Sequence, residues 1–252
     1  MKKNVRKLLF GLCVIVAVAG LAYIGIYYLR KDSNEAVYGK VQRQVKEKKK
    51  EEAQRAEKPK EEIPIDFATL REMNPDIYAW IEIPGTNVNY PIVQSAEDDF
   101  YYLNHTIDGK EGYPGSIYTE KINAKNFSDF NTVIYGHDMK DGSMFKDLHK
   151  FEDAAFFEEH DKVTIYTETE EKTYQIFAAV VYDDRHLMYS FDNENIEDRK
   201  AFLQSLKETR SMRNQFRSDV TVDENSHIIT LSTCIGGQPD RRFLVEAVEI
   251  DE

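Results

Sequence analysis

Short runs of apolar and β-branched residues, separated by turn-forming residues, follow one another through most of the chain after residue 65. Several runs are rich in Val, Ile, Thr and Tyr, which is typical of half-buried strands. We therefore predict strands over 79–83, 88–93, 116–119, 132–135, 162–167, 172–182, 227–232 and 242–250.

Helical periodicity is confined to fewer places. It extends over 144–160 and 194–209, and Asp66 is placed to cap a short helix that ends at Asn74-Pro75. Because the strands do not alternate regularly with helices, the pattern predicts a mainly antiparallel barrel or sandwich with helical insertions, and it argues against a doubly wound α/β sheet.

The N-terminal region has a different pattern. Residues 8–29 contain no charge, and 22 residues of helix are long enough to cross a bilayer. Lys2, Lys3, Arg6 and Lys7 precede this segment, so the predicted orientation has the N-terminus in the cytoplasm. The alternative is a signal peptide cleaved after Ala17-Val18-Ala19. The apolar run continues well past that site, which favours an uncleaved signal-anchor.

A charge-dense segment follows. Residues 40–62 contain almost no large apolar side chain, and Pro59 and Pro64 lie at the segment's end. This pattern is typical of a stalk, and a solvated helix with Glu/Lys pairs would hold the domain away from the membrane equally well. The predicted organisation is a cytoplasmic N-terminus (1–7), a transmembrane signal-anchor (8–29), a charged extracellular stalk (30–65) and one catalytic domain (66–252).

Composition narrows the functional classes. Hydrophobic residues make up 41% of the chain, which excludes global disorder. The net charge is -12, and residues 63–252 hold 37 acidic and only 18 basic residues, so the domain is not a general nucleic-acid binder. No cluster has the spacing of a zinc or calcium site, and we predict neither a required metal nor a cofactor.

Cysteine usage points to one residue. Cys13 lies inside the apolar segment and Cys234 near the C-terminus, so the two cannot pair. A single thiol in an exported domain is either reactive or an intermolecular link. Cys234 follows the apolar strand 227–232 and precedes Gly236-Gly237, which places the thiol at a strand end. The alternative is a small buried apolar residue.

Two further residues have a suitable context for chemistry with this thiol. His137 follows a second apolar strand and Gly136, so its imidazole and the Cys234 thiol could meet as a nucleophile and an acid/base. Arg242 lies where a hairpin would return a guanidinium to stabilise an oxyanion. The chain has six histidines, and spacing alone does not separate Arg242 from Arg241.

These motifs resemble those of the sortases, and specifically class B. The resemblance rests on TLSTC at 230–234 and NTVIYGHDMKDGSMF at 131–145, and it extends to NPDIYAWIEIPGTNVNYPIVQ at 74–94, YYLNH at 101–105 and GSIY at 115–118. It covers nearly all of 66–250. The resemblance implies a closed eight-stranded β-barrel with N-terminal helices and an inserted helix before the catalytic strand, which fits 194–209.

The resemblance also assigns roles. It places the nucleophile at Cys234, the general acid/base at His137 and the arginine that stabilises the oxyanion and the substrate at Arg242. Ser232 and Thr233 fall where the family contacts substrate; for Ser232 the alternative role is a strand-end hydroxyl that bonds to backbone.

The implied activity is that of a membrane-anchored cysteine transpeptidase. It would cleave an Asn-Pro-x-Thr type sorting signal on an exported protein after Thr through a thioacyl-enzyme, and pass the acyl group to an amine of a peptidoglycan precursor or to a pilin lysine. The implied location is the cell membrane, single-pass, with the catalytic domain outside. The alternatives are a hydrolytic cysteine peptidase, which would use the same residues, and a non-enzymatic adhesin.

Overall fold

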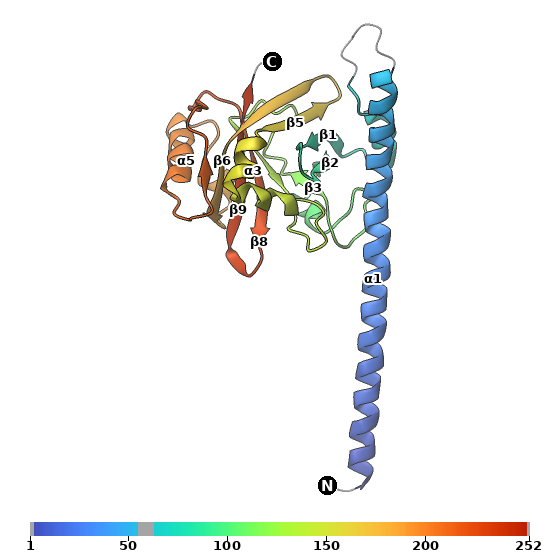
Figure 1. Ribbon diagram of the computed structural model, residues 1–252. Coiled ribbons are helices and arrows are strands. Elements are labelled where there is room, and N and C mark those ends of the chain that lie inside the picture. Colours follow the sequence, from blue (N-terminus) through green and yellow to red (C-terminus); the bar gives the residue numbers. More distant parts are fainter. Residues whose placement is uncertain (1–2, 55–62, 251–252) are drawn as a thin grey trace.

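The computed structural model describes residues 3–54 and 63–250, except for the side chains of 3–11, 14, 26–35 and 51–54. A long N-terminal helix lies beside a β-barrel, with short helices on the barrel surface (Figure 1). The strands are β1 (Ile77–Glu82), β2 (Asn89–Val93), β3 (Ile117–Thr119), β4 (Asn131–Tyr135), β5 (Lys162–Thr167), β6 (Glu171–Asp183), β7 (Gln215–Phe216), β8 (Ile228–Ile235) and β9 (Gln238–Ile250). The helices are α1 (Lys3–Gln54), α2 (Phe67–Met73), α3 (Ala154–Glu159), α4 (Leu187–Ser190) and α5 (Ile196–Glu208), with 3₁₀ turns η1 (Tyr101–Leu103) and η2 (Lys146–Glu152).

The sheet closes on itself. Its strand order is β5-β1-β2-β3-β4-β8-β9-β6, and β6 pairs with β5 to complete an eight-stranded barrel. β7 adds two residues beside β6 at Ala178 and Ala179. Closure leaves little sheet edge unpaired. The predicted fold class is confirmed, although two neighbouring pairs, β2–β3 and β4–β8, are parallel.

Two apolar clusters hold the barrel together. The larger contains Trp80, Phe145 and Phe243, all fully buried, and extends to apolar side chains of the helices α1 and α2. The smaller lies where α5 covers the opposite face of β6, β8 and β9, and includes Phe202 and Leu206 of that helix. The helix predicted over 194–209 is present as α5, and the side chain of Asn195 caps it by accepting from two backbone N–H groups.

Helix α1 packs on the barrel through a short stretch near its C-terminal end. Tyr38, Val41 and Val45 are buried there as part of the main core. The Tyr38 hydroxyl donates to the backbone oxygen of Gly115, and Lys49 forms an ion pair with Glu82 of β1. The folded unit therefore includes residues that the charge pattern assigned to the stalk, and the blue N-terminal half of α1 extends away from the barrel (Figure 1).

The segment predicted to span a membrane, 8–29, falls in α1. Among the described residues, none of the helices combines the length and apolar character needed for a bilayer crossing. The side chains of 8–11, 14 and 26–29 lie outside the described part of the chain.

A buried carboxyl lies in the barrel wall between β8 and β9. Glu246 is fully buried, and burial raises the pKa of its carboxyl from 4.5 to about 8, although the hydrogen bond from Thr230 opposes this. The Thr230 hydroxyl faces two acceptors, Glu246 Oε2 at 2.7 Å and Asn131 Oδ1 at 3.0 Å, but has one proton to donate. Protonation of Glu246 removes this conflict, since the carboxyl can then donate to Thr230.

We predict that Glu246 makes folding stability decrease as the pH rises from 4.5 toward 8. In that range the folded state keeps a proton that the unfolded state has lost, so the free energy of unfolding falls, by up to about 5 kcal/mol. Glu246→Gln is neutral at every pH and should raise the Tm strongly at pH 8 and little at pH 5. Thermal unfolding of both proteins across this range checks the prediction. Glu168→Gln, at an exposed carboxylate, is the control; an equal Tm gain at pH 5 and pH 8 for Glu246→Gln would refute it.

Candidate active site

The registers of three neighbouring strands bring the predicted catalytic residues together. In the parallel β4–β8 pair Tyr135 lies opposite Ser232, so His137 and Cys234, each two residues further on, reach the same end of the sheet. In the antiparallel β8–β9 pair Cys234 lies opposite Arg242. His137, Cys234 and Arg242 line one cavity of about 230 Å³.

The backbone before His137 is tightly confined. A Cβ at Gly136 would lie 2.5 Å from Ile117 Cδ1 and 2.7 Å from the Phe145 ring, both of which are fully buried. The Gly136 N–H donates to Ser232 at 3.1 Å, and the Gly136 carbonyl accepts from the Thr233 hydroxyl at 2.8 Å. Only glycine fits this position, and the fit fixes where His137 leaves the strand.

The imidazole of His137 is half-buried. Its Nε2 lies 2.6 Å from the carbonyl oxygen of Leu103, so this nitrogen carries a proton and donates it. The other nitrogen, Nδ1, is therefore the one available for proton exchange with a substrate or thiol. The thiol of Cys234 is exposed, and the Cys234 carbonyl oxygen accepts from Nε2 of His149 at 3.0 Å.

The structure separates the two neighbouring arginines. Arg242 lines the cavity with Cys234, and its Nη1 donates to the carbonyl oxygens of Pro239 and Arg241 at 2.9 and 2.8 Å. Arg241 lines a different cavity. Successive residues of a strand point to opposite faces, so only Arg242 shares the thiol's side of β9.

Ser232 and Thr233, the two predicted substrate contacts, both line the cavity. The Thr233 hydroxyl is already bonded to the Gly136 carbonyl and helps to hold the His137 segment in place.

Sequence reasoning missed a hydrogen-bonded carboxyl–imidazole pair in the cavity wall. Glu120, which directly follows β3, is 2% exposed, and His186 Nε2 lies 2.8 Å from its Oε1. Burial raises the pKa of the Glu120 carboxyl, and His186 partly reverses this shift. Glu120 Oε2 and His186 Nδ1 are buried without a hydrogen-bond partner among the described residues. The two residues are far apart in sequence, and no motif marked either of them.

The wall also contains two neutral phenols. Burial raises the pKa of Tyr118 and of Tyr135, and their rings stack with centroids 5.3 Å apart. They give this side of the cavity an apolar surface next to the thiol. Among the residues that the structure describes, no group of His, Cys, Asp and Glu has the arrangement of a metal site.

We predict that Gly136→Ala destabilises the fold by about 1–3 kcal/mol, because the added methyl overpacks the contact with Ile117 and Phe145. The same displacement should move His137 and change the rate at which iodoacetamide alkylates Cys234. Chemical denaturation and alkylation kinetics measure the two effects. Gly39→Ala is the matched control, since a Cβ there meets no atom within 4 Å. Unchanged stability in Gly136→Ala would show that Ile117 and Phe145 can make room for the added methyl group.

Comparisons with known proteins agree with this geometry. The Sortase domain model matches residues 81–250. Sortase B of Listeria monocytogenes is 37% identical over 175 residues, which covers 69% of this chain and 68% of that protein. Sortase B of Clostridium perfringens superposes with a TM-score of 0.66 at 31% identity, covering 74% of this chain and 100% of that one. The Staphylococcus aureus sortase B–substrate complex superposes with a TM-score of 0.73 at 28% identity, covering 88% of this chain and 99% of that one.

The family model thus spans most of the chain, and the relatives and structures named above are all sortase B proteins. The chain belongs to the sortase family and, within it, to the sortase B class of cysteine transpeptidases.

Proposed function

We propose that Cys234, His137 and Arg242 are the catalytic residues, and that the enzyme cleaves an Asn-Pro-x-Thr type sorting signal after Thr and transfers the new acyl end to an amine of a peptidoglycan precursor. The observation that supports this most directly is that the three side chains, supplied by adjacent strands, line one cavity. A sortase B relative has been solved with its substrate, which supports a peptide ligand at this site.

The first half-reaction forms a thioester. As the Cys234 sulfur attacks the Thr carbonyl, the thiol proton passes to Nδ1 of His137, and Arg242 stabilises the oxyanion that develops. When the tetrahedral intermediate collapses, the C–N bond breaks and His137 gives a proton to the leaving amine through Nδ1. Because Nε2 is bonded to Leu103, the ring is held in one orientation while Nδ1 exchanges its proton.

The second half-reaction regenerates the thiol. The incoming amine attacks the thioester carbonyl, His137 accepts the amine proton, and the C–S bond breaks to release Cys234 as product leaves. Water competes with the amine at this step. The apolar side formed by Tyr118 and Tyr135 restricts ordered water next to the thioester, which favours transfer over hydrolysis.

Each catalytic variant should fail at a defined step. Cys234→Ala should form no acyl-enzyme and no product, and Cys13→Ala is the matched thiol control. His137→Ala should lower kcat by about 10²–10⁴-fold, and Arg242→Gln by about 10²–10³-fold. Arg71→Gln, at an exposed ion pair far from the cavity, should leave kcat unchanged. Mass spectrometry of trapped acyl-enzyme and peptide-cleavage kinetics measure these effects; full activity in Cys234→Ala would overturn the assignment.

Product analysis distinguishes transpeptidation to a precursor amine from the alternative functions. Added amine should divert product from free acid to amide while total turnover is maintained or increased. Free acid alone, at every amine concentration, would identify a hydrolytic peptidase. Reaction with a lysine side chain of a partner protein, in preference to a precursor amine, would identify a pilin-polymerising enzyme. Ligand binding that survives alkylation of Cys234, with no turnover, would identify an adhesin.

We also propose that the N-terminal half of α1 anchors the enzyme in the cell membrane, with the barrel outside. Support comes from the uncharged run 8–29 and from its exposed apolar side chains, among them Leu12, Ile15 and Leu21. The stretch from Tyr38 to Lys49 that packs on the barrel lies outside this run, so anchoring and folding use different parts of one helix.

Two truncations test this division of α1. A chain that starts at residue 36 keeps the packed stretch and should leave the membrane fraction with its Tm and peptide cleavage intact. A chain that starts at residue 63 also loses Tyr38, Val41 and Val45 and should have a lower Tm, because three buried apolar side chains are removed. Cell fractionation and thermal unfolding check both outcomes. Retention of the first truncation in the membrane fraction would contradict the anchor.

A further inference from the structure

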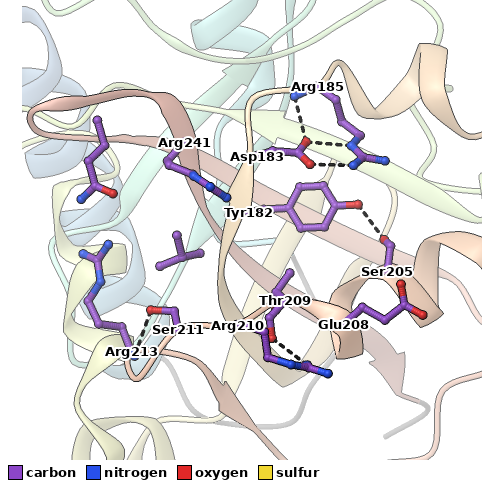
Figure 2. Close-up of a pocket in the computed structure, with 12 residues that line it drawn as sticks. Tyr182, Asp183, Arg185, Ser205, Glu208, Thr209, Arg210, Ser211, Arg213 and Arg241 are labelled. Atoms are coloured by element: carbon purple, nitrogen blue, oxygen red, sulfur yellow. Dashed lines mark hydrogen bonds and ion pairs between the residues drawn. The ribbon is translucent and has the colours of Figure 1, made fainter.

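A second cavity, of about 600 Å³, lies next to the active-site cavity and is rich in arginine (Figure 2). Its lining comes from the end of β6 and the loop after it, the C-terminal end of α5 with the following loop, and the start of β9. We call it the arginine pocket, after its four guanidinium groups: Arg185, Arg210, Arg213 and Arg241. Asp183 and Glu208 are its acidic members, so the lining has an excess of positive charge.

Two of the four arginines are neutralised within the protein. Arg185 forms a two-point ion pair with Asp183, with N–O distances of 2.7 and 2.6 Å, as the dashed lines in Figure 2 show. Arg213 lies 3.1 Å from a carboxylate oxygen of Glu152. These pairs fix the two side chains in the wall of the pocket.

The other two arginines keep most of their charge available. The described contacts of Arg210 are to the carbonyl oxygens of Lys207 and Thr209, and it forms no ion pair within the described part of the chain. Arg241 has Asp240 as its ion-pair partner at 3.8 Å, a weak interaction between exposed groups. Such cations are unusual here, since residues 63–252 hold twice as many acidic as basic residues.

The arginine pocket and the active-site cavity share a wall. Tyr182, Asp183 and Arg185 line both cavities. β9 runs past both, with Arg242 opposite Tyr182 and Arg241 opposite Asp183 on β6. Adjacent residues of one strand thus supply one guanidinium to the thiol's cavity and the next to the arginine pocket.

We propose that the arginine pocket binds an oxyanion group, a carboxylate or a phosphate, of the amine acceptor that resolves the thioester. This rests on the proposed function, since it names the chemistry of that function's second substrate. The forked guanidinium donors match pairs of carboxylate or phosphate oxygens. A cavity of about 600 Å³ exceeds the size of one small anion and fits a group attached to a larger molecule.

The charge also acts on the acceptor's amine. A simple protonated amine is repelled by the arginine pocket, whereas an acceptor that carries its own anion is attracted to it. The arginine pocket therefore selects acceptors that combine a reactive amine with an oxyanion.

Acceptor kinetics test this inference with the full chain. The probes are peptides with one free α-amine, a graded spacer of neutral residues and a final phosphoserine, glutamate or serine, each ending in an amide. The wild-type enzyme should show a lower KM for the phosphoserine or the glutamate acceptor than for the serine acceptor. The lower of the two anionic KM values identifies phosphate or carboxylate as the natural group.

The variant Arg210→Gln with Arg241→Gln should remove this preference. Its KM for the preferred anionic acceptor should rise about tenfold or more, the effect expected for lost charge-assisted hydrogen bonds. Its KM for the serine acceptor should change little. Arg71→Gln with Lys200→Gln, which removes the same charge from exposed ion pairs elsewhere, is the matched control. Equal KM values for all three acceptors in the wild type, or an equal rise for all three in the variant, would overturn the inference.

Binding of inorganic diphosphate keeps this test separate from the proposed function. Cys234→Ala should bind diphosphate, measured by calorimetry, and should lose that binding when Arg210→Gln and Arg241→Gln are added. Equal diphosphate binding with and without the two arginine substitutions would refute the arginine pocket, even if amide forms with the serine acceptor. Failure to form amide with every acceptor would refute the proposed transpeptidation. Both arginines are exposed, so we expect the variants to keep the wild-type Tm. Thermal unfolding checks that they are folded.

Discussion

The pairing of β8 with its two neighbours is the constraint on which the site depends. The parallel ladder to β4 and the antiparallel ladder to β9 fix which residues lie beside Cys234. A slip of one residue would turn Arg242 away from the thiol and bring Arg241 in its place. The buried side chains that alternate along β8 and β9, Leu231 and Val245 inside and Leu244 under α5, resist such a slip. Core packing and catalytic geometry are therefore set by the same register.

The molecule places opposite electrostatic environments close together. The barrel wall contains Glu246, whose carboxyl is held neutral by burial, whereas the shared wall of the two cavities holds charged groups in contact with solvent. Thiolate chemistry requires cations near the sulfur, and recognition of an acceptor's anion requires cations near the entering amine. In the functions proposed above, the Arg241-Arg242 pair on β9 would provide one cation for each purpose, in a domain with an excess of acidic residues.

Helix α1 shows how a strong local signal can hide a weaker one. Tyr38, Val41 and Val45 follow helical spacing and form one apolar face, but they lie beside a segment dense in Lys and Glu. Charge density predicted a stalk there, because three apolar residues are too few to define an amphipathic helix by periodicity. Their burial depends on segments that are far away in the sequence; the Tyr38 hydroxyl, for example, contacts Gly115 and Ser116.

The sequence by itself determined many local elements and indicated the reactive groups, although the helix predicted over 144–160 is the 3₁₀ turn η2 followed by the short helix α3. β5 was predicted at its observed bounds, Asp66 caps α2 as expected, and the TLSTC and YGH motifs marked Cys234 and His137, because caps, strand propensity and motifs act over a few residues. Tertiary structure alone decided what depends on long-range pairing: the separation of Arg241 and Arg242 into two cavities, the Glu120–His186 pair and the two-residue β7. These features arise from strand register and burial, which join residues without any local pattern to relate them.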